Sequence, residues 1–112
     1  MRENPYSDFI VVLMTSPDRE EAEQIARAIL EGRKAACVSI FPRGDSLFWW
    51  QGKIDRAREF LLVAKTRRTL LEDLIATVKE THGYEVPEII ALPVSGGNPD
   101  YLRWLTEETR DG

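Results

Sequence analysis

The 112-residue sequence predicts one α+β domain, in which two β-α-β units are joined by a long hairpin. Three observations indicate this class. Four apolar segments have the composition of strands, at residues 9–14, 36–51, 59–65 and 88–94. Two segments with apolar residues at helical spacing separate the first strand from the second and the third from the fourth, and another follows the last strand. We expect residues 1–112 to form this single domain, with residues 1–7 as an N-terminal tail.

The first strand and the first helix are predicted at residues 9–32. Residues 9–14 are apolar on consecutive positions, which is typical of a strand in the middle of a sheet. Ser16 is then expected to cap a helix that has Pro17 at its first position and Asp18 in its first turn. Gly32 is expected to end this helix.

The second and third strands are predicted to form an extended hairpin. The second strand runs through residues 36–40, bends at Pro42 and Gly44, and resumes at residues 46–51. The third strand is predicted at residues 59–65, where the apolar run is continuous. A strand of this length projects beyond a four-stranded sheet.

The second helix is predicted to start at Thr66 or Thr69, since Thr69 has Glu72 three residues later in the pattern of a capping box. Gly83 is expected to end it. In the fourth strand, Pro87 and Pro93 restrict the extended segment to residues 88–94.

A C-terminal helix is predicted after Gly97, with Asn98 as its cap and Pro99 in its first turn. The order β-α-β-β-α-β followed by this helix predicts a ferredoxin-like sandwich, with an antiparallel sheet covered by helices on one face. Apolar residues on the other face have no predicted cover within the chain. We therefore expect an obligate oligomer.

The composition excludes several classes of protein. No apolar run is long enough to span a bilayer, and the N-terminal segment lacks the layout of a secretory signal, so we expect a cytoplasmic protein without a membrane partner. The net charge of −4 argues against nucleic-acid binding. The single cysteine excludes an intramolecular disulfide, and no CxxC or HxxxH spacing indicates a structural zinc site.

Several short motifs follow one another along the chain: Thr15-Ser16-Pro17-Asp18, Ala35-Ala36-Cys37-Val38, Trp50-Gln51-Gly52-Lys53-Ile54, Lys65-Thr66, Tyr84-Glu85-Val86-Pro87-Glu88-Ile89 with Leu92-Pro93, and Gly97-Asn98-Pro99-Asp100-Tyr101-Leu102. Motifs of these types in this order resemble the CutA family, which is named for divalent-cation tolerance. The resemblance implies a ferredoxin-like fold, a homotrimer similar to the PII signalling proteins, and no settled enzymatic activity.

The resemblance also implies positions for a copper site. Some family members have been assigned a cysteine late in the first strand and two adjacent histidines as ligands. This sequence has Met14, Thr81 and His82 there, with Gly83 where the family usually has proline. The candidate metal ligands are therefore His82 and Met14, and a thioether suits mainly cuprous ion.

A second candidate site is a ligand pocket between subunits, formed by Cys37, Trp50, Lys65, Tyr84 and Glu88. Lys65 closes one apolar strand and Glu88 opens another, so the two charges are interpreted first as a structural ion pair and second as part of a ligand site. Cys37, between alanines and a valine, is most simply a small buried hydrophobic residue rather than a metal ligand or redox centre. His82 has an equally simple interpretation, as a polar residue at a helix end.

Three functions compete. The first is a trimeric divalent-cation tolerance protein that binds copper or another divalent cation weakly and is not an enzyme. The second is a PII-like regulator that holds a small anionic ligand between subunits, with Lys65 as a counter-charge. The third is an acylphosphatase-like hydrolase, which we rank last because residues 15–18 lack the glycines and arginine of a phosphate-binding loop.

Overall fold

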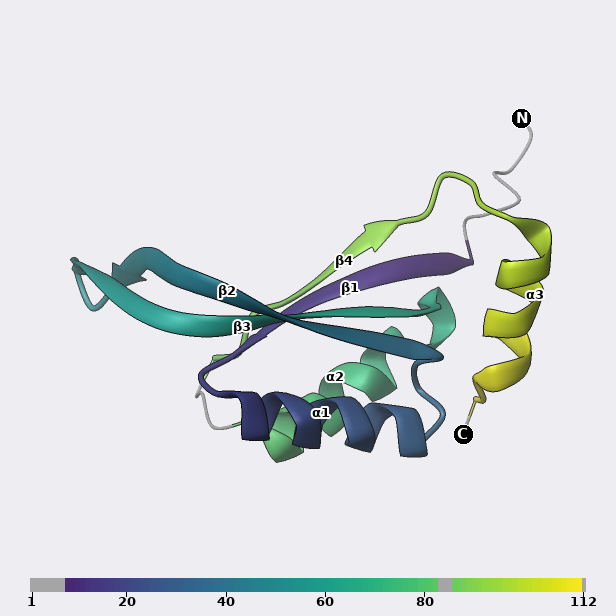
Figure 1. The fold of residues 1–112 in the computed structure, drawn as a ribbon, viewed down its shortest axis with the longest axis horizontal. Helices are drawn as coiled ribbons and strands as arrows, with labels where there is room; N and C mark the ends of the chain where they lie inside the picture. The colour runs from purple at the N-terminus through teal and green to yellow at the C-terminus, as the bar shows by residue number, and fades with distance from the viewer. Residues whose placement is uncertain (1–7, 83–85, 112) are drawn as a thin grey trace.

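The computed structural model describes residues 8–82 and 86–111, and the predicted α+β class is confirmed (Figure 1). The predicted tail at residues 1–7 and the predicted helix end at Gly83 lie outside these residues. The elements in chain order are β1 (Phe9–Ser16), α1 (Arg19–Glu31), β2 (Cys37–Trp50), β3 (Lys53–Arg67), a 3-10 turn η1 (Arg68–Leu70), α2 (Leu71–Thr81), β4 (Ile89–Pro93) and α3 (Pro99–Glu108).

The four strands form one antiparallel sheet in the order β2-β3-β1-β4. Helices α1 and α2 lie together on one face, α3 lies at one end, and the β2–β3 hairpin projects from the other end (Figure 1). Alternate residues of β1, namely Ile10, Val12 and Met14, are buried under the two helices because successive strand residues point to opposite faces. They pack in one core with α1 and α2.

In the described part of the chain no helix is long and apolar enough to cross a membrane.

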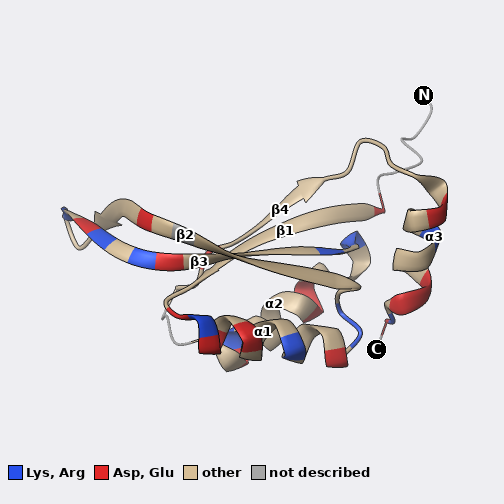
Figure 2. Cartoon of the chain, in the orientation of Figure 1, with Lys and Arg blue, Asp and Glu red and all other residues tan. Residues whose placement is uncertain are grey.

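The sheet face opposite α1 and α2 is apolar and incompletely covered. Neither β1 nor β4 contains a charged residue (Figure 2). On the open face Leu13 and Val63 are half-buried, while Ile90 and Leu92 are 52% and 46% exposed. Within the described residues, α3 covers one end of this face, where the Lys65 Nζ lies 5.7 Å from the centre of the Tyr101 ring. The rest of this apolar surface is open in a single chain.

The prediction that Ser16 caps the first helix is wrong, because Ser16 is still paired with Phe60 in the sheet. The helix starts two residues later, and Asp18 is the cap: its Oδ1 accepts a hydrogen bond from the Glu21 backbone N–H at 2.8 Å. The Ser16 hydroxyl donates to the Asp18 carbonyl at 3.1 Å. At α3, the predicted cap is confirmed, since Asn98 accepts from the Asp100 N–H at 3.0 Å.

The predicted threonine caps of α2 are also wrong. A 3-10 turn leads into α2, and no side chain caps either of them. Thr66 belongs to β3, and its hydroxyl donates to the Lys34 carbonyl at 2.6 Å. Thr69 is directed to Asp111 instead, with 3.5 Å between their oxygens. Both hydroxyls therefore tie β3 and η1 to distant segments rather than to the helix start.

The β2–β3 hairpin is longer than the sequence indicates, because β3 begins at Lys53 rather than at residue 59. Residues 53–58 are mostly charged, and their strand structure depends on pairing with β2, where Asp45 forms ion pairs with Arg56 at 3.4 Å and Arg58 at 3.8 Å. The predicted bend is confirmed as a register shift between Pro42 and Gly44. Positive φ angles of 51° and 80° at residues 51 and 52 close the hairpin with a tight turn.

Candidate functional site: the hairpin pocket

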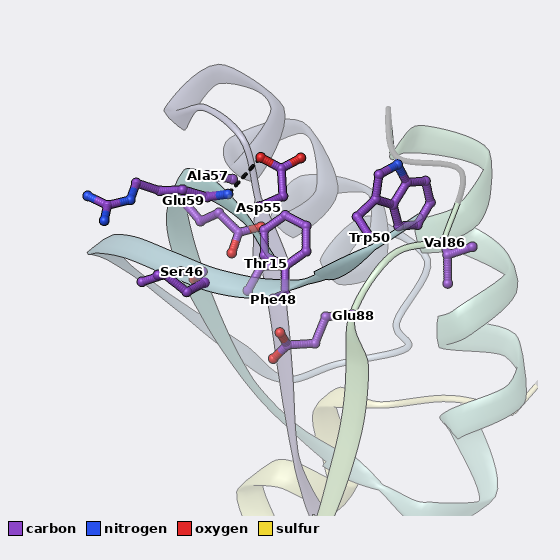
Figure 3. A pocket seen from close by; sticks show the side chains of 11 residues that line it. Thr15, Ser46, Phe48, Trp50, Asp55, Ala57, Glu59, Val86 and Glu88 are labelled. Carbon is purple, nitrogen blue, oxygen red and sulfur yellow. Dashed lines mark hydrogen bonds between the residues drawn. The ribbon is translucent and has the colours of Figure 1, made fainter. Parts of the chain in front are cut away.

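A cavity of about 440 Å³ lies between the projecting hairpin and the segment that enters β4 (Figure 3). We call it the hairpin pocket. Its residues come from the end of β1, from both hairpin strands and from the segment before β4: Thr15, Ser46, Leu47, Phe48, Trp50, Asp55, Arg56, Ala57, Glu59, Val86 and Glu88. A cavity of this volume is within the range of small-molecule sites.

The two aromatic residues of the pocket, Phe48 and Trp50, share one side of β2 because side chains alternate along a strand. Ser46, Phe48 and Trp50 are two residues apart and therefore point to the same side of the hairpin. In Figure 3 the Trp50 indole lies near Val86, and the Phe48 ring lies towards the middle of the pocket. Trp49 points to the opposite side, as expected from the sequence, and is 73% exposed.

The charges that line the hairpin pocket are mainly negative. Three acidic residues, Asp55, Glu59 and Glu88, line it together with Arg56. The Arg56 side chain is paired with Asp45, and its backbone N–H donates to the Asp55 carboxylate at 2.7 Å (Figure 3). The residues that line the described pocket therefore include more acidic than basic side chains.

The hairpin pocket contains two of the five residues that the sequence predicts for a ligand site. Trp50 and Glu88 line it, while Cys37 and Lys65 are paired with each other across β2 and β3 at the opposite end of the sheet. Cys37 and Trp50 are thirteen positions apart along β2, a span of about 40 Å in an extended strand. Tyr84 lies outside the described residues. One chain thus holds the predicted residues in two separate places.

Sequence reasoning missed Thr15, Ser46, Asp55 and Glu59 as pocket residues. The signal for Ser46 was the two-residue spacing it shares with Phe48 and Trp50. For Asp55 and Glu59 no local signal was available, because their segment reads as a solvated charged stretch until β3 is known to extend to Lys53.

The two candidate metal ligands have other roles in the described chain. The side chain of His82 is largely buried, and its Nε2 lies 2.6 Å from the carbonyl oxygen of Thr15. A carbonyl oxygen only accepts, so this nitrogen carries a proton and its lone pair is not available to a metal. Met14 is completely buried in the core beneath the helices. No group of three or more His, Cys, Asp or Glu residues that could hold a metal occurs among the described residues.

Cys37 and Lys65 lie near α3 rather than in a cavity with carboxylates. Cys37 is half-buried in the single chain, where the sequence suggested a buried residue. The Lys65 ammonium lies over the Tyr101 ring, an arrangement that stabilises a cation through the ring quadrupole. The contact between Lys65 and Tyr101 helps to hold α3 against the sheet.

The His82 to Thr15 hydrogen bond joins the end of α2 to the end of β1, beside the hairpin pocket. We expect His82→Ala to lower the free energy of unfolding by about 1–3 kcal/mol, because it leaves the buried Thr15 carbonyl without this donor. Thr81→Ala is the matched control, since among the described residues the Thr81 hydroxyl donates back to the Thr77 carbonyl of its own helix. Denaturant unfolding measures the free energy of unfolding of both variants. An equal decrease in the two variants would contradict a structural role for His82.

Comparison with known proteins identifies the relatives of this chain. Residues 10–108 match the family model of the CutA1 divalent ion tolerance protein. A chloroplastic CutA 1 protein of rice is 47% identical over 91% of this chain, and a divalent-cation tolerance protein CutA of Thermus thermophilus is 48% identical over 88%. The chain spans 58% of the rice protein's length and 96% of the Thermus protein's.

The structural comparison agrees. The crystal structure of CutA1 from Oryza sativa superposes with a TM-score of 0.90 at 45% identity, covering 96% of this chain and 98% of the rice chain. The family match covers β1 to α3 and therefore includes both the sheet and the hairpin pocket. The chain belongs to the CutA1 divalent ion tolerance family.

Proposed function

We propose that this protein acts in divalent-cation tolerance as a homotrimer that binds a divalent cation weakly, with copper among the candidate ions, and that it works by binding rather than by catalysis. The observation that carries the proposal is the match of residues 10–108 to the divalent ion tolerance family. Two features of the chain support this proposal. The open apolar sheet face supports assembly, and the hydrogen bond from His82 to the Thr15 carbonyl supports weak cation binding.

Assembly is supported by the amount of apolar surface that one chain leaves open. Ile90 and Leu92 of β4 and Phe41 of β2 are each about half exposed, although all three belong to strands of the sheet. Burial of such surface is worth about 25 cal/mol per Å². We propose that three ferredoxin-like sandwiches pack these sheet faces together and that the projecting hairpins contact neighbouring chains.

Weak cation binding is supported by the surroundings of His82. Because Nε2 donates to the Thr15 carbonyl, a metal would have to displace this hydrogen bond or use the other ring nitrogen. Since the described residues of one chain contain no group of three ligands, further donors would come from another chain or from water. Both requirements reduce the affinity.

Calorimetry on metal-stripped protein tests this function. We expect Cu²⁺ to bind with a dissociation constant in the micromolar range or weaker, since few protein donors are available. His82→Asn should remove most of the binding, while Cys37→Ser should leave it nearly unchanged. Cys37 is paired with Lys65, which lies opposite Val11, whereas His82 contacts Thr15 at the other end of β1. Nanomolar affinity, or loss of binding in Cys37→Ser alone, would contradict the proposed site.

The alternative of a PII-like regulator that binds an anion is not favoured by the hairpin pocket, whose charged residues are mainly acidic. A cytoplasmic location stays a prediction for this chain. The rice relative, for comparison, is named as chloroplastic.

A further inference from the structure

We propose that α3 is a hinged lid over one end of the open sheet face, and that a clasp of basic side chains at its C-terminal end holds it closed. The clasp consists of Arg33, Lys34 and Arg67 together with the segment that they hold, residues 108–110. Opening of the lid is a property of each chain and is independent of the proposed cation binding.

Helix α3 buries few of its own side chains. It has ten residues, of which Leu102 and Leu105 are buried, while Tyr101 and Trp104 are 39% and 41% exposed. A helix of this length is only marginally stable in water when it is not packed against other elements. The contacts at its two ends therefore contribute substantially to keeping α3 in place.

The C-terminal end of α3 is held by two arginines from distant parts of the chain. The last carbonyls of a helix carry partial negative charge and have no partner within the helix, and residues 105–108 include no basic residue. Arg67, at the end of β3, donates from Nε to the Thr109 hydroxyl at 2.8 Å and from Nη2 to the Thr109 carbonyl at 3.2 Å. Arg33, after α1, donates from Nη1 to the Glu108 carboxylate at 2.8 Å. Hydrogen bonds with charged donors of this kind are stronger than neutral ones.

Lys34 is the most buried cation of the clasp. Its side chain is 11% exposed, and its Nζ donates to the Arg110 carbonyl at 3.1 Å and lies 3.5 Å from the Asp73 carboxylate. The Arg110 backbone N–H donates in turn to the Arg33 carbonyl at 2.9 Å. A buried charged donor that loses an acceptor is costly, so Lys34 opposes release of residues 108–110.

The other end of α3 has the features of a hinge. Pairing of the sheet ends where the Val94 backbone N–H donates to the Phe9 carbonyl at 3.1 Å. Residues 95–97 are exposed, lie outside regular secondary structure and include Gly96 and Gly97, whose backbones adopt many conformations. Rotation about this segment would carry α3 away from Lys65 and extend the open apolar face.

Hydrogen exchange followed by mass spectrometry on the full-length protein tests the lid. Arg67→Gln removes the charged hydrogen bonds to Thr109, and Lys34→Met removes the hydrogen bond to Arg110 while it keeps most of the aliphatic stem. We expect each variant to accelerate exchange of the α3 amides by about tenfold or more, because the exchange rate follows the population of the open state. Peptides from β1 should exchange at the rate of the parent, since β1 lies in the core and outside the lid.

Two further variants assign the effect to the clasp. Arg103→Gln is the matched control, because Arg103 is an exposed arginine of α3 whose ion pair with Asp100, at 3.1 Å, stays within the helix. We expect it to leave exchange of α3 unchanged. Arg67→Lys keeps the charge but loses the planar fork that reaches both Thr109 oxygens, so its exchange rate should lie between those of the parent and Arg67→Gln. If Lys34→Met fails to fold, the two Arg67 variants decide.

Two results would overturn the proposal. The first is exchange of α3 that is unchanged in Arg67→Gln, which would show that other contacts, including those of a neighbouring chain, hold the helix. The second is an equal acceleration in α3 and β1, which would show that the clasp stabilises the whole domain and does not close a lid. Light scattering on the same samples measures assembly separately, so failure of the proposed trimer and failure of the lid can be told apart.

Discussion

Replacement of Leu62 by alanine is expected to lower the free energy of unfolding by about 2–5 kcal/mol. Leu62 is completely buried in the core, where it is paired with Met14 of β1 on the face that α1 and α2 cover. Removing its side chain leaves a cavity that the two helices cannot fill without moving. Chemical denaturation at one fixed protein concentration measures the change, because the proposed assembly would couple stability to protein concentration.

Leu30→Ala is the control for this experiment. Leu30 lies near the end of α1 and is 36% exposed, so the same chemical change removes much less buried surface there. Alanine also has the higher helix propensity, which further reduces the cost. We expect Leu30→Ala to cost less than half as much as Leu62→Ala. Similar costs would contradict the described position of the core between the sheet and the two helices.

Introducing a charge on the open sheet face is expected to convert the proposed trimer into a monomer. Ile90→Asp and Leu92→Asp each place a carboxylate on β4, on the face that α1 and α2 leave open. If that face is buried between subunits, an unpaired charge there costs several kcal/mol at each copy of the interface. Light scattering at low micromolar concentration measures the mass, and far-UV circular dichroism shows whether the chain stays folded.

Leu30→Asp is the matched control, since it adds the same charge on the opposite layer of the molecule. We expect this variant to keep the mass of the parent. If both β4 variants also kept that mass, the open face would not be the interface. A parent protein that is monomeric and folded would contradict the homotrimer itself.

Much of the fold could be predicted from the sequence because its elements have strong local signals. Consecutive apolar residues at 9–14 indicate a central strand, and β1 does lie between β3 and β4. The pair Asn98 and Pro99 indicates the start of a helix, and α3 begins there. These signals depend on the backbone within one turn or one strand, which is why a single sequence is sufficient to show them.

The errors occurred where contacts between distant segments override local preference. Thr69 and Glu72 have the pattern of a capping box, but a 3-10 turn precedes the helix, and Thr69 is directed to Asp111 instead. The charged residues 53–58 have weak strand propensity, yet they form part of β3 because β2 pairs with them. Neither partner can be identified from the local sequence.

The sequence by itself determined the order of the elements, the family and the uncovered apolar face, because these depend on motifs and on hydrophobic periodicity. Only the tertiary structure decided which side chains meet. It placed Trp50 and Glu88 together with Ser46 in the hairpin pocket and separated them from Cys37 and Lys65. It also directed the His82 ring to the Thr15 carbonyl. Such contacts depend on strand register and on the length of the hairpin, and a change of one residue in register would point each side chain to the other face.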